Sequence, residues 1–250
     1  MDQANIEQWH IKKPVVCSKN GVVAAQHQLA ADKGAEILAN GGNAVDAAVA
    51  TAFALGCVEP WMCGLGGSGL MVIWLANEQR AVTIDFQGVL PAKIDPNDYP
   101  IDPSVPDTIM GFPGVVDQRN VVGGLAVLVP GALKGLDHAL KHYGTMPLGE
   151  TMAPAIELAD TGMPVDWFTT LQISLAAKDL ASNAAAARLF LPNGAPPEPG
   201  QYLRLGKLPE TLKCIQHAGA DAFYNGEVAS SIANDLRSLG SRIENSDLVS

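Results

Sequence analysis

The sequence has no apolar run long enough to cross a membrane. Its longest such stretch, residues 47–58, is interrupted by Thr51 and Gly56 and falls short of the roughly 20 residues that a membrane-spanning helix needs. Charged residues are also scarce, at 17% of the chain, whereas hydrophobic residues make up 48%. A chain of this composition buries a core instead of staying disordered. We therefore expect a globular protein with no membrane partner.

Cysteine is a second scarce residue. Its four copies are widely separated, and none forms a Cys-x-x-Cys pair of the kind seen in zinc and redox motifs; they are Cys17, Cys57, Cys63 and Cys214. Such scattered cysteines are typical of reduced core residues. The polar N-terminus, residues 1–5, is not followed by the apolar core of a signal peptide. We expect a cytoplasmic protein, or a periplasmic one if a signal peptide was removed.

Positive charge is in short supply as well. The chain has 16 Lys and Arg residues against 26 Asp and Glu residues, a net charge of -10. This balance argues against nucleic acid and anionic membrane surfaces as partners. The 250 residues contain no internal repeat and no linker that demands two units, so we expect a single domain over residues 1–250.

Hydrophobic spacing and turn residues predict a helix-rich α+β chain. An irregular arm over residues 1–20 precedes a short buried strand over residues 21–25. The Asn40-Gly41-Gly42 sequence ends a first helix, and Asn43 is the expected N-cap of the next. The predicted helices cover residues 29–38, 44–55, 129–143, 148–161, 165–189, 209–218 and 227–239, with strands over 70–75 and 81–86 and a proline-rich loop over 91–120.

Residues 64–69 (GLGGSG) have the G-x-G-x-x-G spacing of a dinucleotide site. In such a site the motif follows a strand and opens a helix, whose N–H groups meet the pyrophosphate. Here the predicted order is reversed, with a helix before and a strand after. We therefore expect a turn that permits a close backbone approach, and no nucleotide or other cofactor.

Two other patterns carry no chemistry on their own. His138 and His142 have the spacing of a two-histidine metal face, but residue 139 is alanine and no third ligand is nearby in the sequence. A surface pair is the better interpretation, so we expect no metal. Ser68 is not in a G-x-S-x-G elbow, because residue 70 is leucine.

Several blocks in a fixed order resemble the large subunit of the gamma-glutamyltransferase family, from about residue 22 to the end of the chain. They are GGNAVDAA (41–48), VEP (58–60), GLGGSG (64–69), GLAVLVPG (124–131), APAIELA (153–159), GADAFYNG (219–226) and the final DL (247–248). Agreement over many ordered blocks is far more specific than any single motif.

The resemblance implies an N-terminal-nucleophile (Ntn) hydrolase with an αββα sandwich, to which this chain supplies the helix-rich part of the large subunit. In the family a precursor cuts itself, and the new N-terminal threonine of the small subunit attacks an amide or gamma-glutamyl bond, with its own α-amino group as base. We therefore expect no catalytic residue in this chain, which would continue into a further C-terminal part and a small catalytic subunit. The implied partner is that small subunit, in a heterodimer or a dimer of heterodimers.

The chain departs from the family's pattern after the second strand. Where the family typically reads Asp-Gly-Arg-Glu, and the arginine holds the α-carboxylate of the glutamyl substrate, this chain reads Asp85-Phe86-Gln87-Gly88. Glutamine cannot supply the paired, charge-assisted hydrogen bonds that arginine gives a carboxylate. We expect Gln87, with Phe86 and Gly88, to bind the substrate, and the substrate to be an acyl amide other than glutathione. Relatives in this superfamily act on acylated antibiotics and small oxalic-acid amides.

Two alternatives stay open. Gln87 also fits a catalytically inactive relative that acts as a binding or structural module. In an active enzyme, a basic residue of a nearby loop, such as Lys93 or Arg119, is able to take the place of the arginine.

Overall fold

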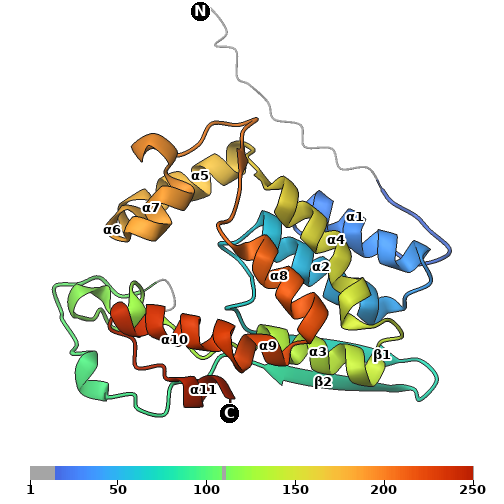
Figure 1. The fold of residues 1–250 in the computed structure, drawn as a ribbon, viewed down its shortest axis with the longest axis horizontal. Coiled ribbons are helices and arrows are strands. Elements are labelled where there is room, and N and C mark those ends of the chain that lie inside the picture. The colour runs from blue at the N-terminus through green and yellow to red at the C-terminus, as the bar shows by residue number, and fades with distance from the viewer. Residues whose placement is uncertain (1–14, 109–110, 250) are drawn as a thin grey trace, which may run out of the picture.

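A computed structural model describes residues 15–108 and 111–249, and in this part of the chain the helices lie to one side of a short hairpin (Figure 1). The helices are α1 (Gln28–Ala39), α2 (Ala44–Val58), α3 (Ala132–Tyr143), α4 (Leu148–Thr161), α5 (Trp167–Leu175), α6 (Ala177–Ser182), α7 (Ala184–Phe190), α8 (Leu208–Ala218), α9 (Asp221–Tyr224), α10 (Glu227–Ser238) and α11 (Asn245–Val249). The strands β1 (Gly69–Leu75) and β2 (Arg80–Phe86) form the hairpin, and β3 (Met163–Pro164) pairs with β4 (Tyr202–Leu203).

The junction between α1 and α2 follows from its local sequence. Gly41 takes a φ of 93°, a conformation that glycine adopts at little cost. The Asn43 side chain accepts hydrogen bonds from the backbone N–H groups of Val45 and Asp46, while the Asp46 carboxylate accepts one from the Asn43 N–H. This reciprocal capping box satisfies the backbone donors that the start of a helix leaves unpaired. The predicted N-cap is confirmed.

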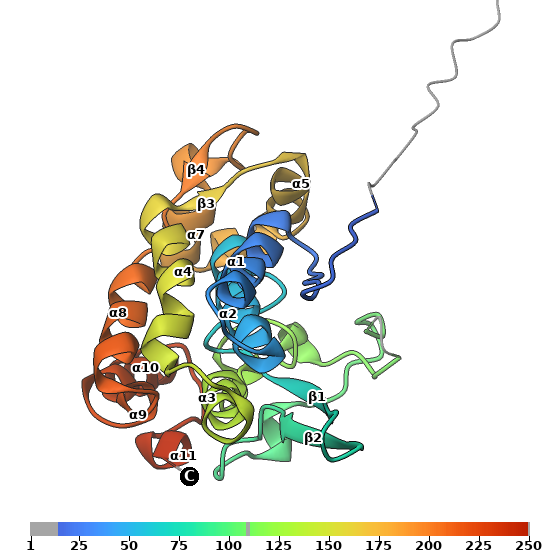
Figure 2. The ribbon, with the colours of Figure 1, turned by 90° about the vertical axis from the view of Figure 1, so that its right-hand side faces the viewer.

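Helix α2 forms the centre of the core because its small residues let neighbours approach closely. It packs against α1, α3 and α4, as Figure 2 shows from the side. A Cβ on Gly34 of α1 would overlap the Thr51 side chain and lie 3.0 Å from the Ala47 carbonyl oxygen. Larger side chains fill the spaces around α2, among them Phe53, Leu133, Met152, Leu212 and Ile215.

The hairpin is covered on one face only. Ile73 of β1 belongs to the same buried cluster as Val49 of α2, and α3 packs against β2 (Figures 1 and 2). The other face carries three large apolar side chains that are 59–71% exposed, namely Leu70, Val72 and Trp74. The hairpin thus has one face packed on helices and one open face.

The structure corrects the prediction of a strand over residues 21–25. These residues pair with no strand, and Val22 is 57% exposed. Val23 packs instead against the buried cluster of Ile37, Ala47 and Ala50 from α1 and α2. Only the part of the N-terminal arm after residue 14 lies within the described residues.

Two further predictions need correction. The helix expected over residues 165–189 is three short helices, α5, α6 and α7, with breaks at Ala176 and Asn183. The cysteines are not all core residues, since Cys57 is buried but Cys17 and Cys214 are exposed. Among the described residues, no helix is both long and apolar enough to cross a membrane.

Candidate functional site

Alternation along β2 turns Gln87 and its two neighbours to opposite sides of the hairpin. Gln87 is exposed and continues the open face that Thr83 and Asp85 occupy, whereas Phe86 and Gly88 are partly buried towards the helices. The backbone N–H of Gln87 donates to the Asp85 carboxylate at 3.0 Å. Its side-chain oxygen accepts a hydrogen bond of 3.4 Å from the Ser68 hydroxyl. Gln87 and Ser68 therefore extend the β1–β2 pairing by one position on the open face.

Phe86 has a packing role on the helical side. Its ring lies where a Cβ on Gly69 or on Gly135 would be, so both glycines make room for it. Gly88 likewise lets the chain pass the segment before α3, because a Cβ there would lie 3.0 Å from Leu128. Of the three residues predicted to bind substrate, Gln87 alone is on the open face.

The glycine turn at residues 64–69 is docked onto the start of α3. It follows α2 and precedes β1, the order predicted from the sequence. The Gly67 carbonyl accepts hydrogen bonds from the N–H groups of Gly131 and Ala132, at 3.1 and 3.0 Å. The first donors of α3 are therefore already satisfied by the turn and are not directed at a ligand.

We expect the purified protein to bind no nucleotide at this turn. Titration calorimetry with NAD, FAD and ATP should give no saturable heat at micromolar concentrations, because the turn uses its own backbone to cap α3. Saturable binding of any of the three nucleotides would contradict this assignment.

A second cap on α3 comes from Tyr224, far away in the sequence. The Tyr224 hydroxyl accepts a hydrogen bond of 3.1 Å from the Lys134 backbone N–H. Burial raises the pKa of Tyr224, an effect that the backbone hydrogen bonds from Lys134 and Leu133 oppose. The Lys134 ammonium lies 5.3 Å from the centre of the Tyr224 ring, within the range of a cation–π contact. Sequence reasoning missed Tyr224, although its block was part of the resemblance.

An open pocket with a volume of about 350 Å³ lies beside the unpaired edge of β2. It combines the predicted substrate residue with charged and aromatic side chains from α3, α9 and α11. Its lining is Ile84, Asp85, Phe86, Gln87, Val89, Val129, Pro130, Gly131, Lys134, Gly135, His138, Tyr224, Asp247 and Leu248. Neither Lys93 nor Arg119 is among these lining residues. Lys93 pairs with Glu244 at 2.7 Å and Arg119 with Asp117 at 2.8 Å.

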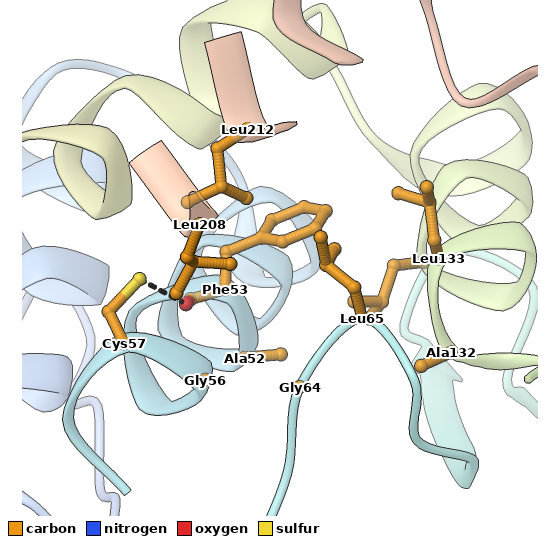
Figure 3. A pocket seen from close by; sticks show the side chains of 11 residues that line it. Ala52, Phe53, Gly56, Cys57, Gly64, Leu65, Ala132, Leu133, Leu208 and Leu212 are labelled. Carbon is orange, nitrogen blue, oxygen red and sulfur yellow. Dashed lines mark hydrogen bonds between the residues drawn. The ribbon is translucent and has the colours of Figure 1, made fainter. Parts of the chain in front are cut away.

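A much smaller cavity of about 30 Å³ lies inside the helical layer (Figure 3). Apolar side chains from α2, the glycine turn, α3 and α8 converge on it, including Phe53, Leu65, Leu133 and Leu212. The Cys57 thiol lines this cavity. Burial raises the pKa of this thiol to about 12, so it is protonated at neutral pH and is not a nucleophile. This cavity is a packing feature of the core.

The two histidines of α3 lie on the surface. The rings of His138 and His142 stack with their centres 3.9 Å apart, and both residues are exposed. The described residues contain no group of three or more side chains arranged to hold a metal ion.

Comparison with known proteins gives a consistent result. The family model for gamma-glutamyltranspeptidase matches residues 30–250. The chain is 41% identical over 237 residues to an acylase ACY 1 proenzyme of Pseudomonas sp. (strain SE83), covering 95% of this chain and 42% of that one. It is 37% identical over 238 residues to the glutathione hydrolase proenzyme of Bacillus subtilis (strain 168), covering 94% of this chain and 39% of the relative. It thus spans about two fifths of these relatives.

Solved structures agree on the fold. The gamma-glutamyltranspeptidase of Helicobacter pylori superposes with a TM-score of 0.84 at 33% identity, covering 95% of this chain and 65% of that one. The cephalosporin acylase of Bacillus halodurans superposes with a TM-score of 0.81 at 28% identity, covering 99% of this chain and 45% of that one. One fold therefore serves relatives named for different amide substrates.

Proposed function

Since the chain belongs to the gamma-glutamyltranspeptidase family and has its α+β Ntn-hydrolase fold, we propose that it is part of the large subunit of an amide hydrolase or acyltransferase. The nucleophile is the N-terminal threonine of a small subunit cut from the same precursor. The relatives' description as proenzymes supports such processing.

In the proposed reaction the threonine hydroxyl attacks the amide carbonyl while the threonine's own α-amino group takes the hydroxyl proton. Donors of the small subunit stabilise the oxyanion of the tetrahedral intermediate. Collapse of that intermediate breaks the C–N bond, the amine leaves with the proton, and an acyl ester remains on the threonine. Water or an acceptor amine then releases the acyl group. This chain contributes one wall of the acyl pocket.

The partner surface is the open face of the hairpin. Leu70, Val72 and Trp74 form a continuous apolar stripe on it, and a contiguous apolar patch of this kind marks an interaction site. We propose that the β layer of the small subunit covers this stripe, which completes the αββα sandwich and brings the threonine towards Gln87.

The substrate is proposed to be an acyl amide other than glutathione. The single observation that carries this proposal is the position of Gln87, at the end of β2 on the open face, where the family's arginine is expected. Its neutral amide and the Ser68 hydroxyl form a polar pair that donates hydrogen bonds without supplying positive charge.

Replacement of Gln87 by arginine tests this assignment. In the processed enzyme, Gln87→Arg is expected to raise kcat/KM for a gamma-glutamyl anilide by about 10- to 100-fold relative to a neutral acyl anilide. This factor corresponds to the free energy of one charge-assisted hydrogen bond between the arginine and the substrate carboxylate. The matched control is Gln79→Arg, at the opposite end of the hairpin, which should leave the ranking unchanged. The assignment of Gln87 to the acyl pocket would be wrong if the wild-type enzyme already prefers the gamma-glutamyl anilide. It would also be wrong if Gln87→Arg leaves the ranking of the two anilides unchanged.

The alternative is a catalytically inactive relative that acts as a binding or structural module, and the loss of the arginine is the feature that favours it. Expression of the full precursor separates the two. Cleavage into two chains with threonine at the new N-terminus, together with turnover of any amide, supports the enzyme. A precursor that stays intact and inactive supports the module.

A further inference from the structure

Glu59, the residue that follows α2, has a buried carboxyl group without a partner. The residue is 4% exposed. Among the described residues no group donates a hydrogen bond to this carboxyl, and none of their ion pairs includes it. Burial raises the pKa of Glu59, because an ionised carboxylate is costly in the interior unless it is paired or hydrogen-bonded. The described part of the chain therefore leaves this charge uncompensated.

The ends of three helices meet around Glu59, and none of them supplies a positive charge. Helices α1 and α2 pack against each other in opposite directions, so His27 at the start of α1 lies near the end of α2. The Nδ1 of His27 accepts the Leu29 N–H at 3.1 Å, and an imidazole that accepts a hydrogen bond at one nitrogen is neutral. Asp166, which caps α5 by accepting the Thr169 N–H at 2.7 Å, adds negative charge near Glu59.

The end of α2 is itself favourable for a cation. Unpaired carbonyl groups give a helix C-terminus a partial negative charge. Pro60 has no N–H to offer the Gly56 carbonyl, and no other donor to that carbonyl is found within residues 15–108 and 111–249. A carboxylate is unfavourable at this end of a helix, whereas a cation interacts favourably with both the helix end and Glu59.

The Glu59 carboxyl group is accessible to a side chain from outside. Nε1 of Trp61 is the one side-chain nitrogen or oxygen of the described residues that is both sealed from solvent and unpartnered, so the Glu59 oxygens keep a small contact with solvent. No group of three or more His, Cys, Asp or Glu side chains in the same part of the chain is arranged to hold a metal ion. A lysine or arginine fits instead, because its long aliphatic stem carries the charge through a narrow opening.

We propose that Glu59 binds one basic side chain, a lysine or an arginine, from the part of the precursor beyond residue 250. This inference rests on the proposed function, because it requires that the chain belongs to a longer precursor. The matched stretch covers only 39–42% of the curated relatives named above, so most of such a precursor lies outside the chain. The ion pair ties the meeting ends of α1, α2 and α5 to that remainder.

The test compares wild type with Glu59→Gln in the enzyme processed from its full precursor. The variant is expected to lower the midpoint of thermal unfolding at pH 7 by about 5 °C or more, because it leaves the basic partner unpaired in a buried site. A paired carboxylate has a lowered pKa, so the difference should stay constant down to about pH 5 and shrink at lower pH. The nearby titratable groups, His27, Cys63 and Asp166, are common to both proteins, so the comparison isolates Glu59.

The opposite sign overturns the proposal. If Glu59 stays unpartnered in the whole enzyme, its raised pKa makes the ionised form costly. Glu59→Gln is then as stable as wild type or more stable, with an advantage that grows as the pH rises. The matched control is Glu198→Gln, at an exposed position, which should shift the midpoint by less than about 2 °C. An equal shift in the control would also overturn the role of Glu59.

A double-mutant cycle identifies the partner. Each lysine and arginine beyond residue 250 is replaced by methionine in wild type and in Glu59→Gln, and the partner is the residue whose replacement lowers the midpoint only in wild type. Glu59→Asp keeps the charge and should lose less stability, and it takes the place of Glu59→Gln in the cycle if that variant does not fold. The absence of any coupled basic residue would overturn the proposal, whether the midpoint then responds to EDTA, which indicates a metal ion, or to enzyme concentration, which indicates a second copy.

The proposed function has a separate readout in the same experiments. Cleavage of the wild-type precursor and turnover of any amide leave that function intact when Glu59 shows no coupling. A precursor that neither cleaves nor turns over any amide would overturn the proposed function, and a coupled basic residue found in that intact precursor would still support the role of Glu59.

Discussion

Residues 1–250 expressed alone are expected to show no amidase activity, and co-expression with the remainder of the precursor is expected to create it. The chain spans only 39–42% of the curated relatives named above, and the proposed nucleophile lies outside it. Loss of a catalytic nucleophile costs enzymes on the order of a millionfold in kcat. The isolated chain should therefore be indistinguishable from buffer.

The nucleophilic side chains in and around the described pockets support this expectation. Burial raises the pKa of the Cys57 and Cys63 thiols to about 12 and about 11, which keeps both protonated at neutral pH. The Ser68 hydroxyl bonds to the Gln87 amide oxygen, which is not a base that could activate it. The measurement compares the isolated chain with the co-expressed pair on the same anilides. Turnover by the isolated chain alone would show that the nucleophile has been assigned to the wrong part of the precursor.

Elements whose ends are determined by the local sequence could be predicted well. The Asn-Gly-Gly-Asn sequence at residues 40–43 stops one helix and starts the next within four residues, and helix α4 has the predicted bounds, Leu148–Thr161. The hairpin was also predicted within one residue at each end. At the helix ends the determinants, a glycine with a positive φ or a capping side chain, act over a few residues. The hairpin turn is equally local, with a positive φ at Gln79.

One local signal was available but overlooked. Asn183 precedes a run of alanines, and its side chain caps α7 by accepting from the N–H groups of Ala185 and Ala186, each at 3.0 Å. Recognition of this N-cap would have divided the long helix predicted over residues 165–189.

The candidate site was harder to predict because its parts come from distant segments. Gln87 was identified from the family pattern, but the cap that Tyr224 places on α3 joins residues 90 apart in sequence. The position of α3 beside Gln87 depends on the close approach of Gly131 to β2. The strand wrongly predicted over residues 21–25 is a similar case, since Val23 packs on residues of α1 and α2 and the segment pairs with no strand. Contacts of this kind are set by tertiary packing, which local propensity does not encode.

The largest loss of stability is expected from Asp46→Ala. Asp46 is fully buried and joins the start of α2 to the connection between α3 and α4. Its carboxylate accepts hydrogen bonds from the Asn43 N–H at 2.7 Å, the Thr145 hydroxyl at 2.6 Å, the Thr145 N–H at 3.0 Å and the Met146 N–H at 3.1 Å. Alanine leaves these buried donors without an acceptor, which costs more than the hydrogen bonds contribute in net terms. We expect the free energy of unfolding at pH 7 to fall by about 3 kcal/mol.

Urea denaturation of wild type and variant measures this difference. The matched control is Asp32→Ala, an exposed position of α1, which should change stability by no more than about 0.5 kcal/mol. A loss below about 1 kcal/mol in Asp46→Ala, or an equal loss in the control, would show that the carboxylate does not hold the two segments together.

The same comparison should depend on pH with a defined sign. Burial by itself raises the pKa of Asp46, but the hydrogen bonds from Thr145, Asn43 and Met146 outweigh it and hold the pKa below its usual range. Because the folded-state pKa is lowered, the unfolded chain binds the proton more readily, and the ionised carboxylate contributes its full stability above the unfolded pKa of about 3.9. That contribution is lost as the pH falls from there through the folded-state pKa. The difference between wild type and Asp46→Ala should therefore be constant from pH 7 to about pH 5 and shrink below about pH 4, whereas a difference that grows on acidification would mean that Asp46 is protonated in the folded state.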